Sequence, residues 1–189
     1  MQLKQISTIS AGHSFRGTIE ETSGSNIIAV QMKNITANGD IDWYGCVHTM
    51  VNSKKEPQWL MPSDILIAAR GNQFYSVLVD EKMPSEFKAL ASPYFYVIRL
   101  KNQEVLPEFL VWQLNQKICQ RYFEKSTEGS FTKSIRRNVV EETPVIIPSL
   151  KKQQSILGLI EVLKKENKII EKLKKRGEQI NSLLANELI

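Results

Sequence analysis

The chain has 189 residues and a formal net charge of +5, enough for one compact domain of the usual size, roughly 100–150 residues, and a further extended segment. Charge alone does not indicate nucleic acid, because residues 1–148 carry 16 basic against 15 acidic side chains and residues 149–189 carry 9 against 5. Since no apolar run approaches the roughly 20 residues of a membrane span or resembles a secretory leader, a soluble cytoplasmic protein is expected. Cys46 and Cys119 are expected to be buried thiols, because neither belongs to a disulfide or zinc pattern.

Short apolar segments dominate the first two-thirds of the chain. Four of them have the length and composition of strands, at 27–30, 65–68, 75–79 and 94–98. Turn-forming residues separate them, at 23–26, 37–40, 61–64 and 70–72. This alternation predicts a curved, mostly antiparallel sheet.

A helix is predicted to begin at Pro107, because proline is favoured at the first helical position. Apolar side chains then recur every fourth residue and form a stripe that would pack on the sheet, at Leu110, Leu114, Ile118 and Tyr122. The helix is expected to end before the turn-forming residues 127–130.

Basic residues cluster around and after the end of this helix. The segment 121–137 holds Glu124 and Glu128 against five basic residues, Arg121, Lys125, Lys133, Arg136 and Arg137. This segment is the best local candidate for phosphate contacts, and an ordinary solvated loop is an equally good interpretation of its spacing.

A long second helix is predicted from Leu150 onward. Segment 144–148 has the features of a short edge or terminal strand bracketed by prolines, and Ser149 stands where an N-cap belongs. Apolar residues then follow a seven-residue repeat. The repeat predicts a coiled-coil seam for dimerisation, formed by Ile156, Leu159, Leu163, Ile170, Leu173, Ile180 and Leu184.

Further apolar residues widen this stripe, so the helix needs a partner. Forty helical residues form a rod roughly 60 Å long, more than a small domain is wide. We therefore expect two parts, a domain over 1–148 and a dimerisation helix over 149–189. The alternative is a hairpin that breaks at Gly177 and covers the chain's own sheet.

Patterns for catalysis are weak. An adenine methyltransferase needs a glycine-rich cofactor loop and an Asp/Asn/Ser-Pro-Pro-Tyr/Phe motif, and residues 92–95 match that motif only in part. His13 and His48 stand alone, without a patterned nucleophile. The chain is therefore not expected to be an enzyme.

A divalent-metal nuclease is the other catalytic alternative. Residues 62–64 could combine with 80–82 or 86–88 to place two carboxylates and a lysine around magnesium. Asp64 directly precedes an apolar run, however, and is more simply explained as a turn residue that begins a strand.

Several stretches occur in a recognisable order. Residues 12–16 have the pattern Gly-x-x-Phe-basic, and 27–35 with 39–41 form a strand and turn. Residues 60–71 are similar to Leu-x-x-Gly-Asp-x-Leu-x-x-x-x-Gly, with Ser63 replacing the usual glycine. Gly129, Ser130 and Ile135 precede a stretch, 143–156, that is similar to Pro-x-x-x-Gln-x-x-Ile, with one more residue between Pro148 and Gln153. In this order the chain resembles the specificity subunits of type I restriction-modification enzymes.

The resemblance implies an α+β fold, in which a curved antiparallel target-recognition sheet with a packed helix is followed by a coiled-coil helix. In that family, two recognition domains are held apart by two antiparallel helices that also dock methyltransferase subunits. This chain has one domain and one helix, which implies a half-subunit that pairs with a second copy and reads a palindromic, bipartite site in double-stranded DNA.

The resemblance also implies that the chain itself needs no cofactor. S-adenosylmethionine would bind the partner DNA adenine methyltransferase, and a separate restriction and translocase subunit would cleave the DNA.

The DNA contacts are expected on loops at one end of the sheet, where side chains suited to bases and phosphates occur. The candidates are Ser14, Arg16, Asn72, Gln73, Ser130, Thr132, Lys133, Arg136 and Arg137. The competing hypothesis is a non-catalytic, dimeric protein-interaction adaptor that binds no DNA. The seam fits both hypotheses, and a steep salt dependence of DNA binding would distinguish them.

Overall fold

The chain forms two compact units, Met1–Ile147 and Pro148–Ile189. The first contains the strands and the short helices, and the second is a single long helix. None of the described helices is long and apolar enough to cross a membrane. The computed structural model describes residues 1–15, 17–51, 56–71, 73–127 and 133–187.

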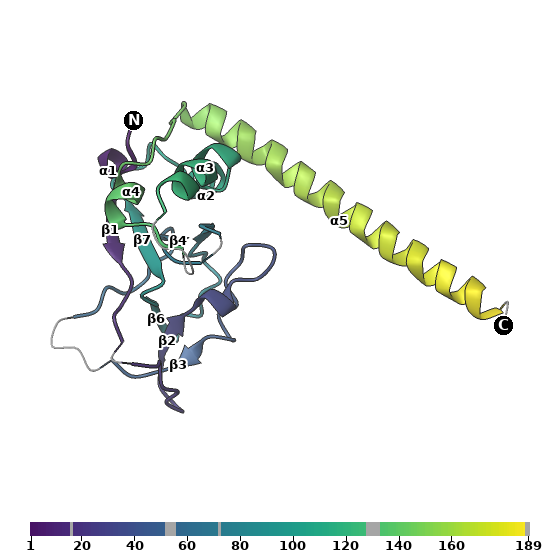
Figure 1. The fold of residues 1–189 in the computed structure, drawn as a ribbon, viewed down its shortest axis with the longest axis horizontal. Helices are drawn as coiled ribbons and strands as arrows, with labels where there is room; N and C mark the ends of the chain where they lie inside the picture. The colour runs from purple at the N-terminus through teal and green to yellow at the C-terminus, as the bar shows by residue number, and fades with distance from the viewer. Residues whose placement is uncertain (16, 52–55, 72, 128–132, 188–189) are drawn as a thin grey trace. The chain divides into compact units, whose positions relative to one another are not determined.

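A four-stranded antiparallel sheet forms the centre of the first unit (Figure 1). The register pairs Ile98 with Ile9 on one side and with Ile65 on the other. Strand β4 has all four side chains buried, as expected for a strand that is covered on both faces. The strand order is β1 (Ser7–Ala11), β7 (Phe95–Leu100), β4 (Ile65–Ala68) and β5 (Ser76–Leu78).

A smaller sheet contains β3 (Val47–His48), β2 (Ile27–Val30) and β6 (Lys88–Ala91), in that order. Strand β2 pairs antiparallel with β3 and parallel with β6. A short 3-10 helix, η1 (Met32–Asn34), follows β2. The mostly antiparallel α+β fold is as predicted, but the strands divide between two sheets instead of forming one.

The two faces of the four-stranded sheet bury different cores. Ile65 and Ile67 of β4 pack with Phe123 in a core on the helical side, whereas Leu66 and Ala68 belong to the core shared with the smaller sheet. Side chains alternate across a strand, so β4 serves both cores. In Figure 1 the four-stranded sheet accordingly lies between helices α2 and α3 and the smaller sheet.

The helix predicted from Pro107 is broken, and the prediction of one continuous helix is wrong. It consists of α2 (Pro107–Leu114) and α3 (Lys117–Lys125). At the break, the Asn115 side chain accepts the N–H of Ser76 at 2.7 Å and donates to the Ser76 carbonyl at 2.8 Å. Asn115 thereby satisfies the free edge of β5, which is a reason for the helix to end there.

The break changes which face of the second helix is buried. Ile118, predicted to continue the apolar stripe, is 79% exposed, and Cys119 and Phe123 are buried instead. The Gln120 side chain donates to the Leu114 carbonyl at 2.8 Å and so satisfies a group that the helix end leaves free.

The end of the first unit pairs with its beginning. The N–H of Val145 donates to the Met1 carbonyl at 2.9 Å, and Gln2 forms an isolated antiparallel bridge with Pro144. The predicted terminal strand is thus reduced to one bridge. Two short helices lie nearby, α1 (Leu3–Ile6) and α4 (Arg137–Glu141).

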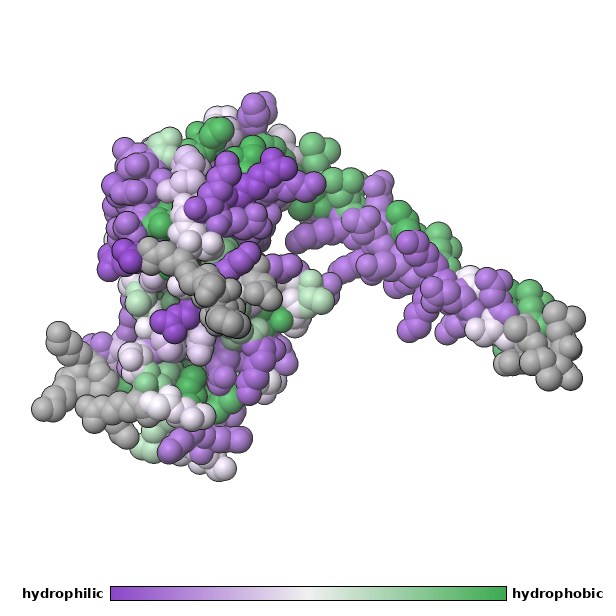
Figure 2. Space-filling view, in the orientation of Figure 1, coloured by the Kyte–Doolittle hydropathy of each residue, from purple (hydrophilic) through white to green (hydrophobic). Residues whose placement is uncertain are grey.

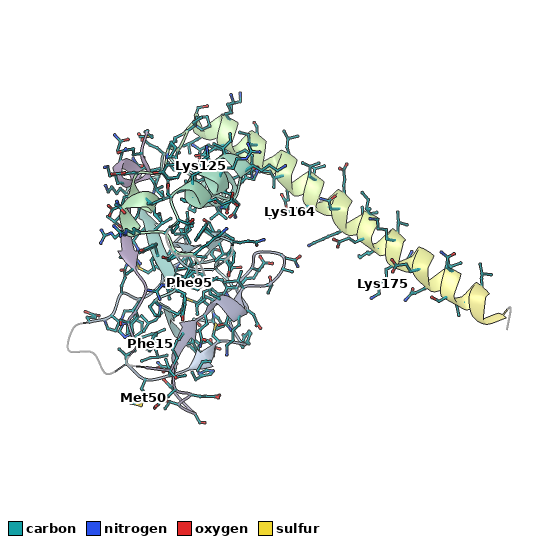
Figure 3. All side chains as sticks on the ribbon, in the orientation of Figure 1. Phe15, Met50, Phe95, Lys125, Lys164 and Lys175 are labelled. Atoms are coloured by element: carbon teal, nitrogen blue, oxygen red, sulfur yellow. The ribbon has the colours of Figure 1, made fainter. Side chains whose placement is uncertain are left out.

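The second unit contains α5 (Leu150–Glu187), a helix of 38 residues. It begins directly after Ser149, whose carbonyl accepts the N–H of Lys152 at 2.9 Å. The helix continues without a break through Gly177, so the hairpin alternative is wrong. Apolar residues lie along one side of α5 in Figure 2, and Lys164 and Lys175 lie on the other side in Figure 3.

Candidate nucleic-acid interface

Loops from distant parts of the sequence meet at one end of the strands of the four-stranded sheet. Because neighbouring strands are antiparallel, β1 and β4 finish at this end, at Ala11 and Ala68, whereas β7 and β5 begin there, at Phe95 and Ser76. We call the residues at this end the loop edge. It comprises the described residues 12–15, 69–71, 73–75, 92–94 and 133–136.

The segment around Lys133 joins the loop edge by pairing with the loop after β4. The N–H of Gly71 donates to the Lys133 carbonyl at 3.0 Å, and the N–H of Ile135 donates to the Ala69 carbonyl at 3.0 Å. Arg70 forms an isolated antiparallel bridge with Ser134. The fold therefore holds the backbones of Arg70 and Lys133 side by side.

An exposed arginine lies over an aromatic ring on this edge. The guanidinium carbon of Arg70 is 5.7 Å from the ring centroid of Tyr94, which is itself 48% exposed. Contact with the ring restricts the arginine, and the residue remains exposed. A guanidinium held in this way can bind a phosphate or the edge of a guanine through two parallel hydrogen bonds.

Tyr96 feels the positive charges of Arg70 and Arg137. Its hydroxyl donates to the Ile135 carbonyl at 3.3 Å. Burial raises the pKa of Tyr96, and the positive charges of Arg70 and Arg137 partly oppose that rise. The Tyr96 hydroxyl is therefore held by the segment that follows Lys133 and lies in the electrostatic field of two guanidinium groups.

The arginines at the start of α4 are both exposed. The Nε of Arg137 lies 2.7 Å from Oε1 of Glu141, one helical turn away. An exposed ion pair of this kind contributes only about 0–1 kcal/mol. Arg137 can therefore exchange its carboxylate partner for a phosphate at small cost.

A glycine positions Ser14 at the other end of the loop edge. A Cβ on Gly12 would collide with the backbone carbonyl of Ser92, so glycine is required there. The N–H of Gly12 donates to the Phe95 carbonyl at 2.9 Å, and that of His13 donates to the Ala91 carbonyl at 2.7 Å. Ser14 is exposed beside a cavity of about 230 Å³.

The predicted contact residues that the structure describes share the loop edge or the first residue of α4, and all are exposed: Ser14, Gln73, Lys133, Arg136 and Arg137. Four others fall outside the described residues: Arg16, Asn72, Ser130 and Thr132. The candidates from the sequence did not include Arg70 and Tyr94, which also lie on the loop edge. A signal was available for Arg70, which directly precedes Gly71 at a turn after a buried strand.

Asp64 lies at the opposite end of the strands, directly before β4, and protein groups satisfy its carboxylate. The Asp64 carboxylate is 1% exposed and accepts two hydrogen bonds from Arg99, at 2.7 and 2.6 Å, and one from the N–H of Met61 at 2.9 Å. Hydrogen bonding to Asp64 raises the pKa of Arg99. Asp64 is therefore a structural residue of the turn before β4, which removes the basis of the nuclease alternative.

The cysteines and histidines that the structure describes have structural surroundings. Cys46 and Cys119 are buried and free, as predicted, and burial raises the pKa of Cys46 to about 12, which keeps it a neutral thiol. Nδ1 of His48 lies 2.7 Å from the Ser25 carbonyl. Among the described residues, no group of three His, Cys, Asp or Glu side chains could hold a metal ion.

The predicted seam of α5 is largely uncovered in the single chain. Ile156 is partly buried, and the other six predicted seam residues are between 50% and 67% exposed: Leu159, Leu163, Ile170, Leu173, Ile180 and Leu184. A continuous apolar stripe of this length on one helix is characteristic of an interaction surface.

A family model described as Type I restriction modification DNA specificity domain matches residues 1–179. The chain therefore belongs to the family of type I restriction-modification DNA specificity domains, and the resemblance seen in the sequence is confirmed. The domain of this family provides DNA specificity and is not catalytic. No curated protein matched the chain in sequence.

Three solved structures share the fold. The S subunit of a type I restriction-modification system from M. genitalium and the HsdS subunit from Thermoanaerobacter tengcongensis are each 12% identical, with TM-scores of 0.57 and 0.60, over 87% of this chain. A chain from a study of complex assembly and conformational transition in the type I R-M system is also 12% identical over 87% of this chain, with a TM-score of 0.62. The match spans 38%, 36% and 37% of those chains, respectively.

Proposed function

We propose that this protein is a half-sized specificity subunit, in which the loop edge reads one half of a bipartite DNA site and α5 pairs with the helix of a second copy. The observation that carries the proposal is the loop edge, where the backbone pairing of 69–71 with 133–135 brings Arg70 beside Lys133. Basic side chains gathered on one edge supply the phosphate contacts that dominate affinity for DNA.

The proposed contact set combines charged and uncharged side chains. Arg70, Lys133, Arg136 and Arg137 would bind phosphates or guanine edges, whereas Ser14 and Gln73 are suited to base edges. Arg16, Asn72, Ser130 and Thr132 complete the set. Partner methyltransferase subunits would bind S-adenosylmethionine and methylate adenine, and a separate restriction and translocase subunit would cleave. Two identical domains related by a two-fold axis would read a palindromic site with a central spacer.

The first experiment identifies the complex and its site. The protein is tagged, recovered from its own host with its partners, and the host DNA is sequenced by a method that detects N6-methyladenine. We expect two copies of this chain to be recovered with DNA adenine methyltransferase. We also expect methylation at a palindrome that is interrupted by a spacer, and this methylation should disappear when the gene is deleted. Recovery without a methyltransferase, or an unchanged methylation pattern, would favour the protein-interaction adaptor.

The second experiment tests the loop edge with the recovered complex. Binding to a duplex that carries the methylated site is measured over a series of salt concentrations for Arg70→Ala and Lys133→Ala. Each lost phosphate contact should lower the slope of log affinity against log salt by about 0.9. Lys101 follows β7 at the opposite edge of the sheet and donates to the Lys4 carbonyl. Lys101→Ala is therefore the matched control, and an equal loss in all three variants would refute this surface.

A further inference from the structure

The long helix contains two unusual seam positions. Glu166 and Gly177 interrupt a repeat that is otherwise apolar from Ile156 to Leu184. A glycine inside a helix costs about 1 kcal/mol relative to alanine. Apart from its chain neighbours and the local helix backbone, no described atom lies within 4 Å of a Cβ built on Gly177. The chain's own packing therefore gives no reason for the glycine. Gly158, the other glycine of α5, lies off the seam.

Parallel pairing of two copies would align these positions badly. Glu166 would face Glu166 of the second copy, and Gly177 would face Gly177. The first layer opposes like charges in a largely apolar seam, and the second leaves a gap without side chains. Two-fold antiparallel pairing avoids both problems, because it matches each position with a different one.

The seam consists of two lines of residues, one through Leu163, Ile170 and Gly177 and the other through Leu159, Glu166 and Leu173. In antiparallel pairing, each residue of one line faces a residue of the other line across the interface. Neighbouring registers therefore differ by one heptad. We propose that two copies pair antiparallel in the register that sets Glu166 against Gly177 of the second copy. The same register sets Leu163 against Ile180 and Ile170 against Leu173. It also sets Leu159 against Leu184, so that apolar side chains meet in every other layer over this length. This inference rests on the proposed pairing of two copies through α5.

The space above Gly177 lets the Glu166 side chain extend to water, and Arg176 lies next to Gly177 in the sequence as an opposite charge. The apolar residues that widen the stripe also find partners. Val162 would face Leu183, and Ile169 would lie against the aliphatic stem of Arg176. Val162, Ile169 and Leu183 are each more than half exposed in the single chain.

The neighbouring registers are worse. Sliding one helix by a heptad in one direction sets Glu166 against Ile170, and sliding it in the other sets Glu166 against Leu184. Each slide buries the carboxylate against a branched apolar side chain and leaves Gly177 opposite Leu159 or Leu173. In the proposed register the two-fold axis passes between Glu171 and Lys172. At a rise of 1.5 Å per residue, the two helix starts at Leu150 lie about 65 Å apart along the helix axis.

Disulfide trapping in the full-length protein tests this register. The double variant Leu163→Cys with Ile180→Cys should form a covalent dimer under mild oxidation, because each cysteine faces the other type in the second copy. Within one chain the two sites are about 25 Å apart along the helix, too far for an internal disulfide. The controls are Leu163→Cys with Leu173→Cys and Ile170→Cys with Ile180→Cys, which would be trapped only in the two neighbouring registers. Single Leu163→Cys would be trapped only in a parallel pair.

A measurement that leaves the seam intact complements the trapping. Ser155 is exposed near the start of α5, so Ser155→Cys can carry a spin label. The proposed register predicts about 50 Å between the two labels along the axis, and the neighbouring registers predict about 39 and 60 Å. Trapping of only the 163/180 pair together with the 50 Å distance would support the register. Trapping of a control pair or of single Leu163→Cys would overturn the register while leaving dimerisation intact, and a monomer in analytical ultracentrifugation would overturn the proposed pairing itself.

Discussion

Ser63 occupies a backbone conformation that glycine adopts more easily. Its φ is 73°, and it is the one non-glycine residue with a positive φ among the residues that the structure describes. The turn directs the Asp64 carboxylate to Arg99, and the N–H of Ser63 itself donates to the Val79 carbonyl at 2.9 Å. The motif to which residues 60–71 are similar has glycine at this position. In this chain Ser63 adopts the left-handed conformation that glycine would adopt there. The retained turn therefore carries a conformational cost for any side chain with a Cβ.

We expect Ser63→Gly to stabilise the protein, because it removes the cost of a left-handed residue with a side chain. The free energy of unfolding should rise by about 0.5–1 kcal/mol, after allowing for the greater freedom of glycine in the unfolded chain. The measurement is urea denaturation followed by circular dichroism. Ser85→Gly is the control, because Ser85 is also an exposed turn residue but has no positive φ, and it should lose stability. Equal destabilisation by both variants would contradict this account.

Helices α2 and α3 depend on one side chain that belongs to neither. Asn115 binds both backbone groups of Ser76 and thereby links the helix break to the edge of the four-stranded sheet. The break resets the helical phase, so that Phe123 enters the core on the helical side of the sheet and Ile118 faces solvent. A four-residue spacing of apolar side chains was present in the sequence, but it continued across a point where the helix does not.

Truncation of two apolar residues of α3, one buried and one exposed, should give different results. Phe123→Ala should lower the free energy of unfolding by about 3–5 kcal/mol, because it opens a cavity among fully buried side chains. Ile118→Ala should change it by less than about 0.5 kcal/mol, because Ile118 is exposed. Both values come from chemical denaturation of the full chain. A larger loss of stability for Ile118→Ala than for Phe123→Ala would instead support the single continuous helix that the sequence predicted.

Two surfaces of the single chain are exposed: the apolar side of α5 is largely uncovered, and Arg70, Lys133 and Arg136 of the loop edge are exposed. Both surfaces are explained by partners that belong to the proposed assembly, a second copy along α5 and DNA along the loop edge. The adaptor hypothesis accounts for the helix alone. The proposed function accounts for the pairing that brings Arg70 to Lys133 as well.

Glu166→Leu should tighten the proposed dimer, because it replaces a charge in the apolar seam with a side chain that fills the space above Gly177. We expect the dimer dissociation constant to fall by about tenfold or more, equivalent to at least about 1.4 kcal/mol. Sedimentation equilibrium of the full-length protein gives this constant. Glu171→Leu removes the same charge and adds the same apolar group outside the seam, so it should change the constant little. Weaker association of the Glu166 variant would argue against this position in the interface.

Local sequence patterns were enough to predict several features of the fold. Strand composition predicted the strands at 27–30 and 65–68. The geometry of Pro107 and the expected N-cap at Ser149 predicted where α2 and α5 begin. All these signals act within a few residues. The repeat of α5 predicted its apolar stripe. The order of motifs predicted the family.

Features that join distant segments of the chain could not be predicted from such patterns. β1 was missed because its polar sequence, Ser-Thr-Ile-Ser-Ala, is given its strand conformation by pairing with β7. The parallel pairing of β2 with β6, the Asn115 break and the approach of Arg70 to Lys133 likewise depend on long-range hydrogen bonds. Local sequence periodicity cannot encode such contacts, because the energy that fixes them comes from residues far away in the chain.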